Sequence, residues 1–183
     1  VSDYFRLKAL YEQGGVYLDT DVELLRPFGD LLELSGFAGF EDAEHVATCV
    51  LGAEKEHGFF RQAMELYEGR TFLREGGEPD LTTNVEILTG LLGRNGLEPD
   101  GARQSVMGME IFPAEYFSPR SLETGKLTKT GNTYAIHWFE ASWQTGSQRF
   151  HRKVAQVIGK KNTERLKKLL GRSGGPESSG RSG

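Results

Sequence analysis

Two aspartates two positions apart, Asp19 and Asp21, are the first residues of this chain whose types and spacing suggest chemistry. In an extended segment, residues at i and i+2 point to the same face, roughly 6–7 Å apart. Both carboxyls are expected to be ionised at neutral pH, so the two negative charges repel each other. A hard divalent cation with oxygen ligands would relieve that repulsion, and the spacing therefore predicts a cation site.

The surrounding residues predict a helix, a glycine turn and a strand that position these carboxylates. Ser2 and Asp3 suit a helix N-cap and first turn, and Gly14–Gly15 suits a helix end. Residues 16–18 then form a short apolar run typical of a strand. The two aspartates would follow at its carboxyl end, where open α/β sheets bind their ligands.

The whole block at residues 2–22, SDYFRLKALYEQGGVYLDTDV, is more specific than the aspartate pair alone. Its SDxxR and GGxYLDxD parts closely resemble the DXD sugar-binding region of glycosyltransferase family 32, which the clostridial glucosylating toxins share. The resemblance implies an α/β fold of the GT-A (Rossmann-like) type with Mn²⁺ or Mg²⁺ as cofactor. It also implies retaining transfer of a sugar from a nucleotide-sugar, with a UDP-sugar favoured, to a saccharide or lipid-linked acceptor in surface polysaccharide (capsule) synthesis.

The resemblance also assigns roles to four residues as the catalytic set. Asp21 would chelate the metal, and Asp19 would contact the metal or the donor ribose. Asp3 and Arg6 would hold the donor sugar and its phosphates. Two simpler interpretations stay open: Asp3 and Arg6 are three apart on a helix and would also form a surface ion pair, and two aspartates after a strand are common turn residues.

A second segment at 133–143, TYAIHWFEASW, predicts a strand that ends at His137. It resembles the family's TYAIHHxxxSW signature, which makes His137 and Ser142 candidate metal ligands and Ser142 and Trp143 candidate donor contacts. A neutral imidazole is a competent ligand for metals of the Mn²⁺ class. Glu140 departs from the family pattern, which has a small residue there, so its role as a ligand is in doubt. A lone histidine after a strand is also commonly a hydrogen-bonded structural residue.

The middle of the chain supplies two further candidates. The segment EPDLTTN at 78–84 partly matches a loop of the family, and the match suggests Thr83 and Asn84 as polar contacts to the donor. Alternatively, Thr83 would cap a helix that runs to Leu92. Other expected elements are paired strands at 37–40 and 46–53, a helix at 57–68 and a strand at 109–119 that ends in a proline turn.

Composition is that of a globular domain, with 37% hydrophobic and 26% charged residues among 183. The lone Cys49 excludes an internal disulfide and suits a reducing compartment.

Residues 149–172 hold nine Lys or Arg and one Glu, in a chain whose net charge is −4. Such a basic amphipathic stretch can contact an anionic membrane, or it can pack on the domain with a solvated basic face. The overall acidity argues against nucleic acid as a partner.

We therefore expect a catalytic domain at 1–146 that lacks its first nucleotide-binding strand or strands, because the chain opens with Val rather than Met directly before its best motif. Basic amphipathic helices would follow at 147–170, and a disordered Gly/Ser-rich tail at 171–183. The expected location is cytoplasmic, including the inner face of the membrane, since no spanning or signal segment is visible. Two alternatives stay open: a catalytically incomplete sugar- or nucleotide-binding homologue, and a hydrolase that uses Asp19 and Asp21 as acid and base.

Overall fold

The computed structural model describes residues 2–70, 78, 80–122 and 124–139. The chain divides into two compact units, and Val1–Ser121 with Leu127–Phe139 makes up the first, which is the unit described below. Its helices are α1 (Ser2–Gln13), α2 (Gly58–Glu65) and α3 (Asn84–Arg94), with 3-10 turns at Leu31–Glu33 and Ala114–Tyr116. Its strands are β1 (Gly15–Leu18), β2 (Val22–Leu24), β3 (Gly36–Gly39), β4 (Val50–Ala53), β5 (Gln104–Val106), β6 (Met109–Phe112) and β7 (Ala135–His137).

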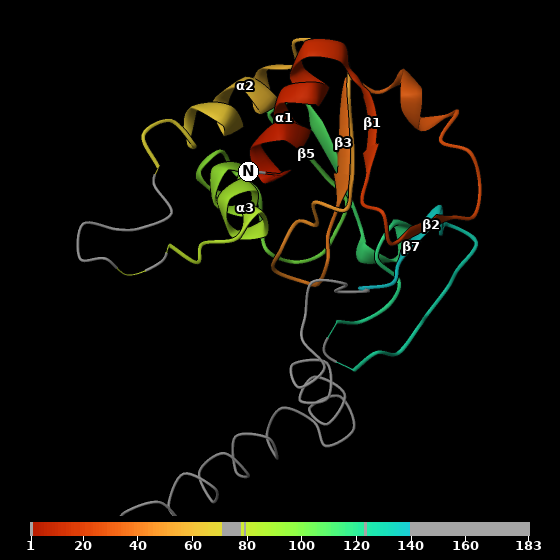
Figure 1. Cartoon of the computed structure of the whole chain (residues 1–183). Coiled ribbons are helices and arrows are strands. Elements are labelled where there is room, and N and C mark those ends of the chain that lie inside the picture. The colour runs from red at the N-terminus through yellow and green to blue at the C-terminus, as the bar shows by residue number, and fades with distance from the viewer. Residues whose placement is uncertain (1, 71–77, 79, 123, 140–183) are drawn as a thin grey trace, which may run out of the picture. The chain divides into compact units, whose positions relative to one another are not determined.

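Five strands form one mixed sheet in the order β1-β4-β3-β6-β5 (Figure 1). β4 is antiparallel to both of its neighbours, β1 and β3, while β3 and β6 run parallel. β1, β3 and β6 therefore point the same way, and their carboxyl ends share one edge of the sheet. β4 begins at that same edge, because Leu18 at the end of β1 pairs with Val50 at the start of β4.

The alternation of side chains along the strands divides the core between the two faces of the sheet. On one face, alternate residues of the central strands pack against the helices in a cluster that includes Leu7, Leu10, Leu51, Phe60 and Leu88. On the other face, their neighbours Phe37, Val50 and Phe112 pack against Phe28, Phe117 and Tyr134. Helices thus cover one face, and an aromatic cluster covers the other.

A glycine turn places the first turn of α1 at the carboxyl edge of β1. Gly14 and Gly15 have φ of 69° and 94°, which L side chains rarely adopt, and a Cβ on Gly14 would lie 2.7 Å from the backbone nitrogen of Lys55. The turn reverses the chain, so that α1 runs away from the edge and β1 returns to it. Asp3 and Arg6 consequently lie at the same end of the structure as Asp19.

The end of α2 and the start of α3 lie close to this end of α1. The Tyr67 ring, just after α2, lies 6.1 Å from the ring of Tyr4 in α1. The Tyr67 hydroxyl donates to Oδ1 of Asn84, the first residue of α3, over 2.7 Å. Thr83 caps α3 in a reciprocal capping box with Glu86, as the sequence predicts for a cap at this position.

The separate two-stranded sheet joins β2, which follows the aspartates, to β7, which lies far along the chain. The strands are antiparallel, and Val22 pairs with His137. Beneath them Tyr134 stacks with Phe28 and Tyr116, at ring distances of 6.0 and 6.1 Å. This aromatic cluster supports the two-stranded sheet.

Most of the expected elements are confirmed. Segments 37–40 and 46–53 pair antiparallel, and the helix expected at 57–68 is observed as the shorter α2, Gly58–Glu65. The strand expected at 109–119 is wrong beyond Phe112, because Pro113 ends β6 and a 3-10 turn follows at Ala114–Tyr116. The fold is mixed α/β as expected, although β3 and β6 are the one parallel pair among the described strands. The GT-A assignment and the domain boundaries stay predictions. The segments at 147–170 and 171–183 lie outside the described residues, and none of the described helices is long and apolar enough to cross a membrane.

Candidate metal centre

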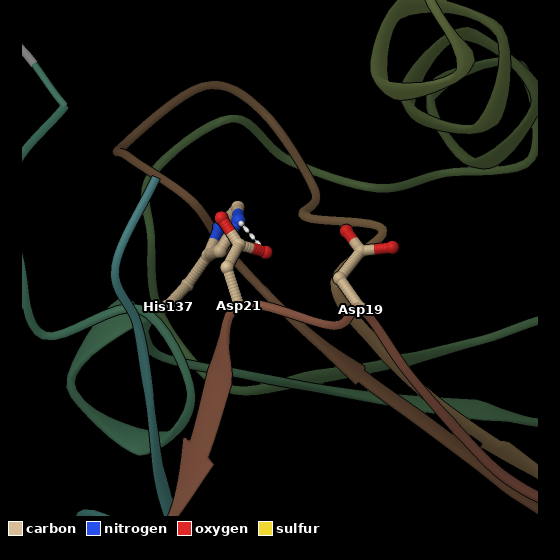
Figure 2. A group of neighbouring side chains, drawn as sticks. All are labelled: Asp19, Asp21 and His137. Atoms are coloured by element: carbon tan, nitrogen blue, oxygen red, sulfur yellow. Dashed lines mark ion pairs between the residues drawn. The ribbon is translucent and has the colours of Figure 1, made fainter. Parts of the chain in front are cut away.

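Asp19, Asp21 and His137 come together at the carboxyl edge of β1 (Figure 2). One ligand atom from each lies within 4.8 Å of those from the other two. Nε2 of His137 is 3.4 Å from Oδ1 of Asp21. The aspartates follow β1, and the histidine ends β7, so the cluster joins the main sheet to the two-stranded sheet.

Backbone hydrogen bonds hold all three residues in place. The Asp19 N–H donates to the carbonyl of Cys49 over 2.9 Å, which extends the β1–β4 pairing by one residue. The Val22 N–H donates to the Asp19 carbonyl over 3.1 Å and closes a turn that contains Asp21. The Trp138 N–H donates to the Asp21 carbonyl over 3.0 Å, so the β2–β7 pairing continues to the metal-ligand candidates.

The donor set fits a divalent cation. The exposed fractions of the Asp19, Asp21 and His137 side chains are 23%, 19% and 13%, so the groups are accessible but largely shielded from bulk water. Two carboxylates with one imidazole suit Mn²⁺-class metals, and carboxylates alone suit Mg²⁺. Adjacent ligands of an octahedral cation lie about 3 Å apart, close to the 3.4 Å separation of His137 and Asp21.

Arg6 links the metal cluster to Asp3. Its Nη1 donates to Oδ1 of Asp19 over 2.9 Å and to the carbonyl of Thr48 over 3.1 Å, and its Nη2 lies 3.1 Å from Oδ1 of Asp3. Only 11% of the Arg6 side chain is exposed. The ion pair expected from the i,i+3 spacing therefore forms, but it is part of a larger network in which Arg6 bridges two carboxylates.

Tyr17 completes this network and was not among the residues singled out from the sequence. Its hydroxyl donates to Oδ1 of Asp19 over 2.8 Å, and its ring lies under the Arg6 guanidinium, 4.7 Å from the ring centroid to Cζ. Burial, and then the hydrogen bond to Asp19, raise the pKa of Tyr17 to about 12, so the hydroxyl stays a donor at physiological pH. The available sequence signal was its position two residues before Asp19, on the same face of the strand.

One comparison with known proteins covers the segment that contains Asp19 and Asp21. Residues 1–38 match the family model described as the glycosyltransferase sugar-binding region containing DXD motif. The match supports a glycosyltransferase-type chain. An uncharacterized protein of Arabidopsis thaliana is 31% identical over 121 residues, which cover 64% of this chain but 18% of that protein. The chain thus spans less than a fifth of that relative's length. No solved structure matches.

The other residues predicted for a glycosyltransferase site fall into two groups. Asn84 is 5% exposed and accepts a hydrogen bond from Tyr67, and it is not part of the metal cluster; its Nδ2 is buried without a hydrogen-bond partner. Ser142, Trp143 and Glu140 lie outside the described residues. The structure therefore brings Asp3, Arg6, Asp19, Asp21 and His137 into one network, of which Asn84 is not a member.

The segment just after His137 has unusual backbone geometry. Phe139 has a φ of 54°, a left-handed conformation that is uncommon for a bulky residue, and its ring lies 4.0 Å from the His137 ring. The indole Nε1 of Trp138 donates to Oε2 of Glu23 on β2 over 2.9 Å. Side-chain and backbone contacts thus both hold the end of β7 against β2, and the imidazole is confined by its neighbours.

Proposed function

We propose that this chain is the catalytic part of a metal-dependent, retaining glycosyltransferase that transfers a sugar from a nucleotide-sugar, with a UDP-sugar favoured. The observation that carries the proposal is the convergence of Asp19, Asp21 and His137 at the carboxyl edge of β1. This convergence occurs in a chain whose first 38 residues match a DXD sugar-binding model. In an α/β sheet this edge is the usual place for a ligand.

The charge of the cluster supports a divalent cation. The Arg6 guanidinium pairs with the carboxylates of Asp3 and Asp19, and the Asp21 carboxylate pairs with His137. Three carboxylates thus lie in one network with Arg6 and His137, and carboxylates and neutral imidazole are the groups that ligate divalent cations. Asp19, Asp21 and His137 would hold Mn²⁺ or Mg²⁺, with Ser142 as a further ligand on sequence grounds. A bound cation would supply positive charge to the diphosphate of the leaving nucleotide.

Asp3 is the residue best suited to accept hydrogen bonds from sugar hydroxyls. Its carboxylate is 42% exposed, and Arg6 fixes one of its oxygens. Asn84 is connected to this end of α1 through Tyr67, whose hydroxyl bonds Asn84 and whose ring contacts Tyr4, the residue after Asp3; the buried amide nitrogen of Asn84 lacks a hydrogen-bond partner. A buried, unsatisfied donor is costly and often marks a place where a ligand or water binds. We therefore assign the donor sugar to the space near Asp3 and Asn84.

Arg6 acts on the donor through the carboxylates that it bridges. Both hydrogens of its Nη1 are directed to protein acceptors, Asp19 and Thr48, and Nη2 pairs with Asp3. In this arrangement it lowers the repulsion between Asp3 and Asp19 and fixes their positions. A rigid, preorganised arrangement of charges is commonly the largest contribution to catalysis.

The remaining parts of the proposal rest on the sequence. Residues 1–146 would form the catalytic domain. The basic helices expected at 147–170 would contact the anionic inner face of a membrane from the cytoplasm. The acceptor would be a saccharide or a lipid-linked saccharide in surface polysaccharide synthesis.

The decisive experiment measures nucleotide release from a panel of UDP- and GDP-sugars, with Mn²⁺ or with excess chelator. It compares the chain with Asp21→Ala and with the control Asp42→Ala, which removes a carboxylate that pairs with a histidine elsewhere on the surface. We expect metal-dependent release that Asp21→Ala abolishes and Asp42→Ala leaves intact. Nucleotide release that persists in excess chelator would favour a hydrolase. Binding of a nucleotide-sugar without release of the nucleotide would favour a catalytically incomplete homologue.

A further inference from the structure

The two oxygens of the Asp19 carboxylate have different environments. Oδ1 accepts two hydrogen bonds, one from the Tyr17 hydroxyl over 2.8 Å and one from Nη1 of Arg6 over 2.9 Å. A carboxylate oxygen has two lone pairs in its plane, so these donors saturate Oδ1. Within the described part of the chain, Oδ2 receives no hydrogen bond.

The two donors to Oδ1 come from different elements of the fold. Arg6 belongs to α1 and is fixed by Asp3 and by the carbonyl of Thr48. Tyr17 belongs to β1, whose pairing with β4 places it opposite Leu51. The guanidinium also lies over the Tyr17 ring, so each donor packs against the other. Movement of the Asp19 carboxylate would therefore disturb both α1 and β1.

An aspartate without such partners rotates broadly about χ2 and can offer either oxygen, or both, to a cation. We propose that Tyr17 and Arg6 are positioning residues that hold Oδ1 of Asp19 and leave Oδ2 as its one ligating atom. This inference rests on the proposed function and extends it. Asp19 would then offer one oxygen, Oδ2, to a bound cation, and the cation would supply positive charge to the phosphates of the donor.

Tyr17→Phe tests the inference, because it removes the hydroxyl and keeps the ring beneath Arg6. The readout is the affinity for Mn²⁺ alone, measured from the electron paramagnetic resonance signal of the free ion. Groups that orient a metal ligand typically contribute 10- to 100-fold in affinity, and we expect a loss of about that size. Tyr11→Phe is the matched control, since no hydrogen bond of the Tyr11 hydroxyl is found in the described structure.

A double-variant comparison separates positioning from a general structural effect. If Tyr17 acts through Asp19, Tyr17→Phe costs no further Mn²⁺ affinity once Asp19→Ala is present. An equal loss in both backgrounds would overturn the inference, as would a Tyr17→Phe variant that binds Mn²⁺ like the unmodified chain.

The proposed function can fail separately. Mn²⁺ binding that depends on Asp21 but not on Tyr17 would leave the metal site standing and overturn the positioning role. A chain that binds no Mn²⁺ at all would overturn the metal site and, with it, this inference.

Discussion

Nε2 of His137 lies 3.4 Å from Oδ1 of Asp21, and backbone pairing produces this contact. Val22, the residue after Asp21, pairs with His137 across the β2–β7 sheet. The Trp138 N–H donates to the carbonyl of Asp21 itself. The two side chains are therefore held together by the strands that carry them, and either can be replaced while the strands keep the other in place.

His137→Ala should weaken Mn²⁺ binding by about ten-fold or more, because it removes one of three protein ligands while leaving the β2–β7 hydrogen bonds intact. Isothermal titration calorimetry of the purified chain with MnCl₂ would measure the change. The effect on Mg²⁺ should be smaller, since Mg²⁺ relies on oxygen ligands.

His45→Ala is the matched control for this variant. His45 also pairs with an aspartate, since its Nδ1 lies 3.0 Å from Oδ1 of Asp42. That pair is more exposed and has no third ligand of the kind found at the metal cluster among the described residues. If His45→Ala lowered Mn²⁺ affinity as much as His137→Ala did, the metal would not be bound where we place it.

Gly52→Ala should destabilise the fold by about 1–3 kcal/mol, the range typical of overpacking a core. A Cβ on Gly52 would lie 2.1 Å from Cε1 of Phe37, whose ring is buried against Phe28 and Phe117 and cannot move aside. Urea unfolding followed by circular dichroism would measure the loss.

Gly58→Ala provides the opposite control. Nothing lies within 4 Å of a Cβ at Gly58, the first residue of α2. Alanine there should raise the free energy of unfolding by about 0.5–1 kcal/mol, because it restricts the unfolded chain. Similar effects at the two glycines would contradict the packing described for β4.

The local features of the site could be predicted from the sequence. The Gly14–Gly15 turn, the strand before Asp19 and the cap at Thr83 each depend on neighbouring residues, and all are present. Such features depend on residues that are close together along the chain, so a single sequence is enough to predict them. The two aspartates follow β1 as expected, but Asp21 lies in a turn closed by the Val22 N–H and the Asp19 carbonyl, so this turn, rather than the period of an extended strand, brings the two carboxylates together.

The long-range features could not be predicted in the same way. β2, β5 and β7 have three residues each, too few for a hydrophobic period to identify strand partners. The resemblance suggested His137 as a ligand, but its pairing with Val22 is a tertiary contact. Similarly, the spacing of Asp3 and Arg6 predicted their ion pair, whereas the contact of Arg6 with Asp19 depends on the reversal of the chain at Gly14.

Alkaline pH should destabilise the fold from about pH 9 upward. Burial raises the pKa of Cys49 from its usual 9.0 to about 12, and it raises those of Tyr17 and Tyr67 from 10.0 to about 12. On raising the pH, these groups lose their protons at lower pH in the unfolded chain than in the folded chain. Their contribution to the free energy of unfolding is therefore complete below the unfolded pKa values and is lost as the pH rises toward 12. Urea midpoints from pH 7 to 11 would show the decline.

Cys49→Ala isolates the share of the thiol in this decline. Without it, the loss of stability should begin near pH 10, where the unfolded tyrosines ionise, rather than near pH 9. An unchanged onset would mean that Cys49 does not contribute.

Tyr67→Phe should lower the free energy of unfolding by about 1–2 kcal/mol, because the buried Asn84 side chain would lose the hydroxyl that bonds its Oδ1 while its Nδ2 already lacks a partner. Chemical denaturation would measure this loss. Asn84→Leu added to Tyr67→Phe should recover most of it, since replacing both polar partners by apolar groups of similar shape is nearly neutral.

The double variant then separates the structural from the functional role of Asn84. If the amide contacts the donor sugar, as proposed, the double variant folds about as stably as the unmodified chain but binds the nucleotide-sugar several-fold more weakly, with unchanged affinity for the free nucleotide. If the double variant and the unmodified chain bind the nucleotide-sugar equally well, the Asn84 amide contributes to stability alone. The donor sugar would then have to be placed closer to Asp3.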